Sequence, residues 1–141
     1  MSEEKKKISA SLEDYLEAIY EIIEEKKNIK AIEVSRKLGV GRSSVSEAIK
    51  VLAEKKLLNY SKYDSFSLTK EGEIEAKRVI QKHNTLFDFF SIVLGLDAEE
   101  ADKNACKIEH VITEKAFERF SKFVDFTKVN KNSNLSDFIK E

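Results

Sequence analysis

Apolar positions in the first part of the chain recur with the period of an α-helix. In the segment LEDYLEAIYEII, which begins at Leu12, they fall three or four positions apart and form one stripe. Ser11 is typical of the start of such a helix, and the polar segment 26–28 ends it. Shorter helical patterns follow over 31–38 and 43–56, separated by the glycine-bearing segment GVGRSS. The pattern predicts three successive helices.

The pattern then changes from helical to extended. The segment LLNYSKYDSFSLT, over 57–69, contains two β-prone runs around a polar turn near 62–65, which predicts a small hairpin. Helical spacing then returns in three segments, over 69–94, 98–112 and 113–126. We therefore expect a mainly α fold.

Composition supports long helices in a soluble protein. There is no proline and there are four glycines, so few residues interrupt a helix. One cysteine cannot form an intrachain disulfide, which favours a reducing compartment. The N-terminus lacks the apolar core of a signal peptide, and the longest apolar run, which starts at Phe89, is too short to cross a bilayer. We expect a cytoplasmic protein with no membrane partner.

Charge is distributed unevenly along the chain, although the net charge is only -1. Residues 30–70 carry nine Lys or Arg and four Asp or Glu, a net charge of +5. The segments on either side, 1–29 and 71–141, each carry a net charge of -3. The middle of the chain is therefore the part best suited to a polyanionic partner.

Two helices joined through a glycine-bearing turn and followed by a hairpin have the outline of a winged helix-turn-helix. The basic excess falls on this unit. Small hydroxyl residues at the start of its second helix would let the backbone approach phosphates and base edges, with cations nearby. The predicted DNA-binding residues are Arg42, Ser43, Ser44, Ser46, Lys50 and, at the tip of the wing, Lys62. We expect a double-stranded DNA operator as partner.

A solvated basic surface that binds no DNA is the alternative, because runs of charge usually indicate only exposure. Glu47 on the presumed reading face weighs slightly against DNA, since a carboxylate repels phosphate, although it can accept a hydrogen bond from a cytosine amino group.

Three potential metal ligands lie within five residues in the segment NACKIEHVI. Cys106, Glu109 and His110 are three and four positions apart, so a helix would present them on one face. A divalent ion requires four to six donors. Further candidates on other predicted helices are Asp14, Glu17 and His83. No local spacing rule requires the three helices to converge.

Each of these residues also has a structural explanation. A lone cysteine is more often a small core residue than a ligand. Asp14 could cap the first helix, Glu17 could belong to a solvated face, and His83 could lie on the surface or in the core.

Several separated motifs together resemble the iron- and manganese-dependent repressors of the diphtheria-toxin-repressor and manganese-transport-regulator (DtxR/MntR) family. The resemblance covers 11–126 and rests on SLEDYLEAIYEI, LGVGRSSVSEAIKVL, LTKEG, QKH and ACKIEHVI. It implies a repressor that senses iron(II) or manganese(II) and controls metal-homeostasis genes, with no enzymatic activity and no small organic substrate.

The resemblance also implies the set of metal ligands, which is Asp14, Glu17, His83, Cys106, Glu109 and His110. Asp14 matches the manganese-type pattern, whereas Cys106 matches the iron-type pattern. Carboxylates favour manganese(II) and a thiolate favours iron(II) or zinc(II), so the residues leave the ion open. The iron-type accessory site has a glutamate at the position of Phe87, and we expect no accessory site of that kind.

The resemblance further implies two domains and a dimer. We expect a winged helix-turn-helix DNA-binding domain over 1–70, a helical metal-binding and dimerisation domain over 71–126, and a polar tail over 127–141. Seven of the nine phenylalanines lie in the second domain, more than three helices can bury, which indicates a homodimer.

In the expected mechanism, the metal ion tethers the DNA-binding domain to the dimer core and thereby sets the spacing of two reading helices. Two alternatives stay open at this stage. One is a metal-independent winged-helix regulator with a structural cysteine and structural histidines. The other is a metal-dependent hydrolase, for which the sequence offers no general base beyond the ligands themselves.

Overall fold

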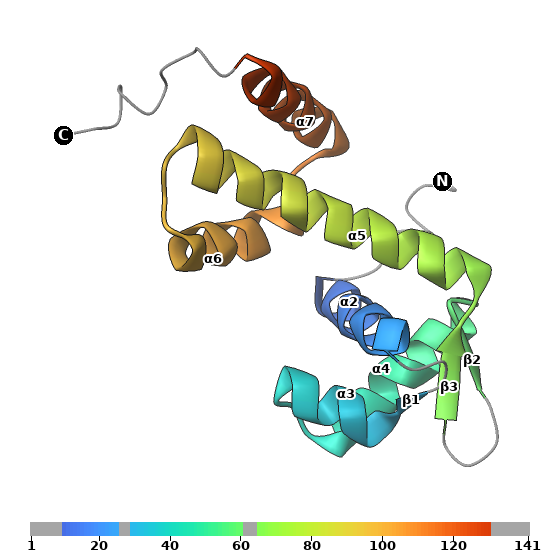
Figure 1. Cartoon of the computed structure of the whole chain (residues 1–141). Helices are drawn as coiled ribbons and strands as arrows, with labels where there is room; N and C mark the ends of the chain where they lie inside the picture. Colours follow the sequence, from blue (N-terminus) through green and yellow to red (C-terminus); the bar gives the residue numbers. More distant parts are fainter. Residues whose placement is uncertain (1–9, 26–28, 61–64, 131–141) are drawn as a thin grey trace. The chain divides into compact units, whose positions relative to one another are not determined.

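The structure is a computed structural model that describes residues 10–25, 29–60 and 65–130 (Figure 1). These divide into two compact units, one up to Val79 and one from Ile80, and the division falls within α5 (Lys70–Asp88). The predicted domain boundaries at 70/71 and 126/127 stay predictions.

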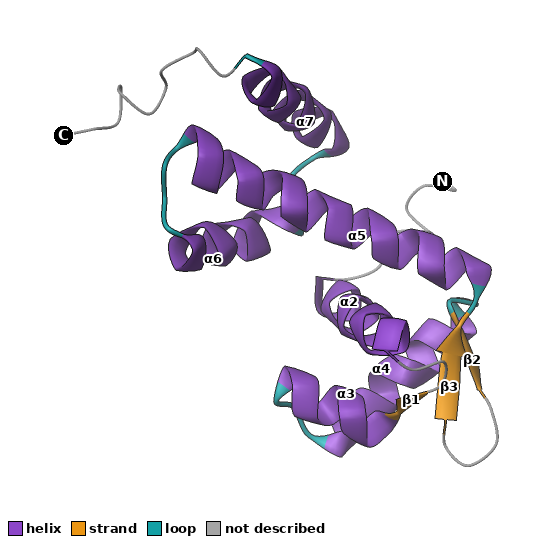
Figure 2. Cartoon of the chain, in the orientation of Figure 1, coloured by secondary structure: helices purple, strands orange, loops and turns teal. Residues whose placement is uncertain are grey.

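Most of the first unit is helical, with a small sheet (Figure 2). Its elements are α2 (Ala10–Glu25), β1 (Ile29–Lys30), α3 (Ala31–Leu38), α4 (Arg42–Glu54), β2 (Leu58–Tyr60), β3 (Ser65–Leu68) and the first half of α5. The mainly α fold with a winged helix-turn-helix is confirmed. The predicted turn near 62–65 lies largely outside the described residues.

The sheet has three antiparallel strands in the order β1-β3-β2. Ile29 pairs with Phe66, and Leu58 pairs with Leu68. The sequence pattern predicted the hairpin but not β1. A strand of two residues is too short to show an alternating pattern, so only its pairing with β3 reveals it.

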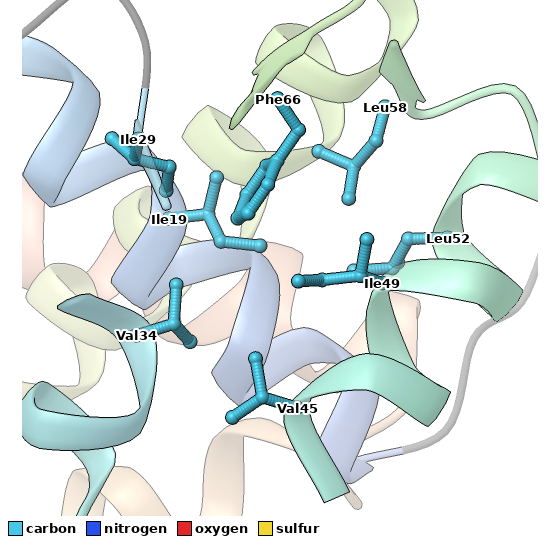
Figure 3. Close-up of a cluster of buried hydrophobic side chains, with 8 residues drawn as sticks. All are labelled: Ile19, Ile29, Val34, Val45, Ile49, Leu52, Leu58 and Phe66. Carbon is cyan, nitrogen blue, oxygen red and sulfur yellow. The ribbon is translucent and has the colours of Figure 1, made fainter. Parts of the chain in front are cut away.

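The main core of the first unit draws on α2, α3, α4 and the three strands (Figure 3). Val45, Ile49 and Leu52, the predicted apolar face of α4, are all buried. They contact buried residues of the other elements, which are Ile19, Ile29, Val34, Leu58 and Phe66. Burial of one such side chain contributes about 1.5–3 kcal/mol, so this cluster fixes α4 against α2, α3 and the sheet.

The turn between α3 and α4 depends on Gly39. This residue has φ 67° and its N–H donates to Ser35 O, which closes the end of α3. A left-handed conformation favours glycine because a Cβ atom is strained there.

The LTKEG segment joins the wing to α5. The Thr69 hydroxyl donates to Lys56 O at 2.7 Å and accepts from Gly72 N at 3.0 Å. A Cβ atom on Gly72 would lie 2.0 Å from the backbone oxygen of Leu57, so this contact also requires glycine. Further along α5, Ala76 packs against Leu16 of α2.

The second unit contains the rest of α5, the π-helical segment η1 (Phe89–Val93), α6 (Ala98–Glu109) and α7 (Glu114–Val129). The predicted helix over about 69–94 is confirmed in its extent, because η1 continues α5 directly, but its last segment is π-helical. In η1 the Leu94 N–H donates to Phe89 O, five residues back. The Phe89 ring packs edge-on against Phe120 of α7, with 4.6 Å between centroids. Such a contact between distant residues leaves no local sequence signal.

The ends of the last two helices also differ from the prediction. α6 ends at Glu109, and His110 forms its C-cap. The hydroxyl of Thr113 accepts from Ala116 N, which confirms the predicted start of α7. α7 continues through 127–129, a segment predicted as part of the tail.

Two lysines of the second unit link α5 to α7. Lys82, which is 7% exposed, lies 3.3 Å from Glu114 and over the Phe117 ring. Lys128 donates to Asp88 at 2.7 Å, and this hydrogen bond raises the pKa of the lysine. These contacts place the aromatic residues of α7 against those of η1.

Candidate metal centre and nucleic-acid interface

Four of the six predicted metal ligands lie together in the second unit. α5 presents His83, α6 presents Cys106 and Glu109, and His110 follows at the helix end. Cys106 and Glu109 of α6 both contact His83, whereas His110 contacts Glu109. Asp14 and Glu17 belong to α2 in the first unit, where Asp14 is exposed and Glu17 half-buried.

Short distances link the donor atoms of these four residues in pairs. His83 Nδ1 lies 3.4 Å from Glu109 Oε2 and 3.8 Å from Cys106 Sγ. His110 Nε2 lies 3.6 Å from Glu109 Oε1. The arrangement brings a carboxylate, a thiol and two imidazoles together, a donor set suited to divalent transition metals.

Glu109 is the buried residue of this group, with a side chain only 2% exposed. Its Oε2 accepts no hydrogen bond from any residue that the structure describes. A buried carboxylate oxygen without a donor costs about 1–3 kcal/mol, and a cation beside it would offset that cost. The buried Glu109 oxygen therefore supports a divalent metal ion at this site, independently of the types of donor.

A further acidic residue, Asp102, contacts this group and was missed by the sequence analysis. Its Oδ1 lies 2.9 Å from His83 Nε2, and His83, Asp102 and Cys106 can all place ligand atoms within 4.8 Å of one another. Asp102 lies four residues before Cys106, so the helical period that linked Cys106 to His110 could have revealed it.

The structure removes one alternative for Asp14. α2 begins at Ala10, so Asp14 lies inside the helix and cannot be its N-cap. A role as the cap therefore does not explain this residue.

The predicted DNA-binding residues of α4 are exposed, and Arg42, Ser46 and Lys50 share one face of the helix. Arg42, Ser43, Ser44, Ser46 and Lys50 are all exposed, while Val45 and Ile49 between them face the core. Glu47 is exposed as well. Lys62 lies outside the described residues. The exposed residues combine hydroxyl groups with two cations, as contacts with a DNA backbone require.

A pocket of about 600 Å³ opens beside the start of α4. Arg42 and Ser46 line one part of it, Lys30 and Tyr60 line another, and Phe66 lies among its apolar residues. Lys30 and Tyr60 were not among the predicted DNA-binding residues, and Lys30 lies on β1, which was not predicted. None of the helices in the described residues is long and apolar enough to span a bilayer.

Two family models match nearly the whole chain. Residues 7–65 match the model described as the iron dependent repressor N-terminal DNA binding domain. Residues 69–134 match the iron dependent repressor metal binding and dimerisation domain.

Individual relatives give the same assignment. An uncharacterized HTH-type transcriptional regulator of Methanocaldococcus jannaschii is 38% identical over 119 residues, which cover 84% of this chain and 95% of that protein. The HTH-type transcriptional regulator MntR of Shouchella clausii is 35% identical over 120 residues, covering 85% of this chain and 83% of the relative.

Solved structures of similar proteins share the fold. IdeR of T. acidophilum is 33% identical with a TM-score of 0.69, covering 78% of this chain and 52% of its own. The manganese regulator SloR is 32% identical with a TM-score of 0.72, covering 82% and 54%. This chain spans about half the length of those two proteins.

Proposed function

Since the chain belongs to the DtxR/MntR family of metal-dependent transcriptional regulators, we propose that it is a repressor that binds operator DNA when iron(II) or manganese(II) is bound. The observation that carries this proposal is the group of donors around Glu109, whose buried Oε2 accepts no hydrogen bond from the described residues. The family consists of transcriptional regulators, so the chain is not an enzyme and the hydrolase alternative is set aside.

The proposed ligand set joins residues of both units. His83, Cys106, Glu109 and His110 hold the ion from the second unit, and Asp14 and Glu17 hold it from α2. When bound, the ion supplies positive charge that neutralises three carboxylates and a thiolate, which otherwise repel one another. The mixture of hard and soft donors is compatible with both iron(II) and manganese(II). The similar protein SloR is a manganese regulator.

Ligands on both units provide the coupling to DNA. Asp14 and Glu17 lie on α2, and α2 packs through Ile19 against the core that holds α4. A metal ion bound to α2 would therefore also restrict the position of α4, the proposed DNA-reading helix. A tenfold gain in DNA affinity requires about 1.4 kcal/mol of differential binding, which a metal site can readily supply.

We also propose a homodimer formed by the second unit. Several apolar side chains of η1 and α7 are exposed: Ile92, Phe123, Phe126 and Val129. Contact between two copies would remove them from water, and the matched model describes a dimerisation domain. A two-fold dimer presents two copies of α4 to two half-sites of DNA. We place the protein in the cytoplasm, where its operator would be.

The test is a DNA mobility-shift titration with manganese(II), iron(II) under anaerobic conditions, and zinc(II). We expect metal to raise the DNA affinity of the full chain, and Cys106→Ala or His110→Ala to abolish this gain while helicity stays intact. DNA binding of equal strength without metal would support the metal-independent regulator and overturn the proposal.

A further inference from the structure

The two ring nitrogens of His83 face different groups. Nε2 lies 2.9 Å from Asp102 Oδ1. Nδ1 lies 3.4 Å from Glu109 Oε2 and 3.8 Å from Cys106 Sγ. One side of the ring is therefore directed to an exposed carboxylate of α6, and the other to the proposed metal ligands.

This arrangement selects one tautomer of the neutral imidazole. An ionised carboxylate can only accept, so the hydrogen bond to Asp102 requires the proton on Nε2. Nδ1 then carries its lone pair toward Glu109 and Cys106. A histidine binds a metal through such a lone pair, and its other nitrogen commonly donates to a carboxylate that fixes the orientation of the ring.

We infer that Asp102 is a positioning residue, which holds the Nδ1 lone pair of His83 toward the metal site through a hydrogen bond to Nε2. This inference rests on the proposed function, because it assumes that the site binds metal. Asp102 itself is not among the proposed ligands.

A purely structural role fits the geometry less well. The Asp102 side chain is 59% exposed and that of His83 is 13% exposed. A contact at such an exposed carboxylate contributes little to the stability of a fold. Asp102 can still orient the ring of His83, because that ring is itself largely shielded from water.

The first measurement concerns the tautomer of His83 in the metal-free full chain. Long-range ¹⁵N–¹H NMR distinguishes protonation at Nε2 from protonation at Nδ1. We expect the Nε2–H form in the unsubstituted chain, a mixture of tautomers in Asp102→Ala, and retention of the Nε2–H form in Asp102→Asn, because the amide oxygen still accepts. A mixture in the unsubstituted chain would overturn the inference.

The second measurement is the affinity for manganese(II). Loss of an outer carboxylate partner lowers metal affinity about 10–100-fold, and we expect a loss of that size in Asp102→Ala and a smaller loss in Asp102→Asn. Glu99→Ala is the matched control, since Glu99 is an exposed acid on α6 one turn earlier. We expect its affinity to equal that of the unsubstituted chain.

The outcomes separate this inference from the proposed function. Equal losses in Asp102→Ala and Glu99→Ala would show a general effect of charge and would overturn the positioning role alone. If the unsubstituted chain binds no manganese(II), iron(II) or zinc(II), both the proposed function and the positioning role fail.

Discussion

Glutamine at position 109 removes the charge from the centre of the proposed metal site while it keeps the size of the side chain. Glu109 is 2% exposed, and its Oε2 accepts no hydrogen bond from the described residues. In the metal-free protein we expect Glu109→Gln to lose no stability, because no hydrogen bond to that oxygen is broken and a buried charge is removed.

In the presence of metal, we expect Glu109→Gln to be less stable than the unsubstituted chain, because it binds the ion more weakly. An ion at 100 times its Kd adds about 2.7 kcal/mol to the free energy of unfolding. For a chain of this size that gain raises Tm by about 5 to 10 °C. Loss of an outer hydrogen-bond partner can weaken metal binding by up to about 100-fold, and loss of a ligand should do at least as much. At the same metal concentration, the ion then adds about 0.4 kcal/mol to the free energy of unfolding of the variant, which raises its Tm by about 1 to 2 °C.

The assay is thermal unfolding followed by far-UV circular dichroism across a series of manganese(II) concentrations. Glu99→Gln makes the same chemical change on the same helix at an exposed position and serves as the control. We expect it to retain the full metal-dependent rise in Tm. A Glu109→Gln variant that also retains the full rise would refute the assignment of Glu109 as a ligand.

Three further outcomes test the fold and the DNA-binding face. Gly72→Ala should lower the free energy of unfolding by about 1–3 kcal/mol in chemical denaturation, because a Cβ atom there would lie 2.0 Å from Leu57 O; unchanged stability would contradict that contact. Thr113→Ala should cost about 1 kcal/mol through loss of the cap on α7, and an unaltered denaturation midpoint would argue against this cap. Arg42→Ala should weaken DNA binding for every sequence and reduce the salt slope of log K by about 1, whereas an unchanged slope would place Arg42 away from phosphate.

The helical period of the sequence was sufficient to predict much of the first unit. The apolar stripe of α4 predicted that Val45, Ile49 and Leu52 face the core, and all three are buried. Local patterns work here because each helix buries one continuous face. β1 escaped prediction because it consists of two residues and exists only through its pairing with β3.

The second unit was harder to predict from local patterns. The π-helical segment after α5 contains Phe89, which packs against Phe120 in another helix, a contact that no local pattern shows. The spacing of Cys106, Glu109 and His110 predicted a shared face, and of these Cys106 and Glu109 contact His83. The contact between Asp102 and His83 depends on how α5 and α6 pack, which spacing alone does not specify.

The central claim is that one ion is held by ligands from both units. Anomalous diffraction at the iron or manganese absorption edge, from crystals of the metal-loaded full chain, would locate the ion directly. We predict an ion bound by Asp14 and Glu17 as well as by His83, Cys106, Glu109 and His110. An ion coordinated only by residues of the second unit would contradict it.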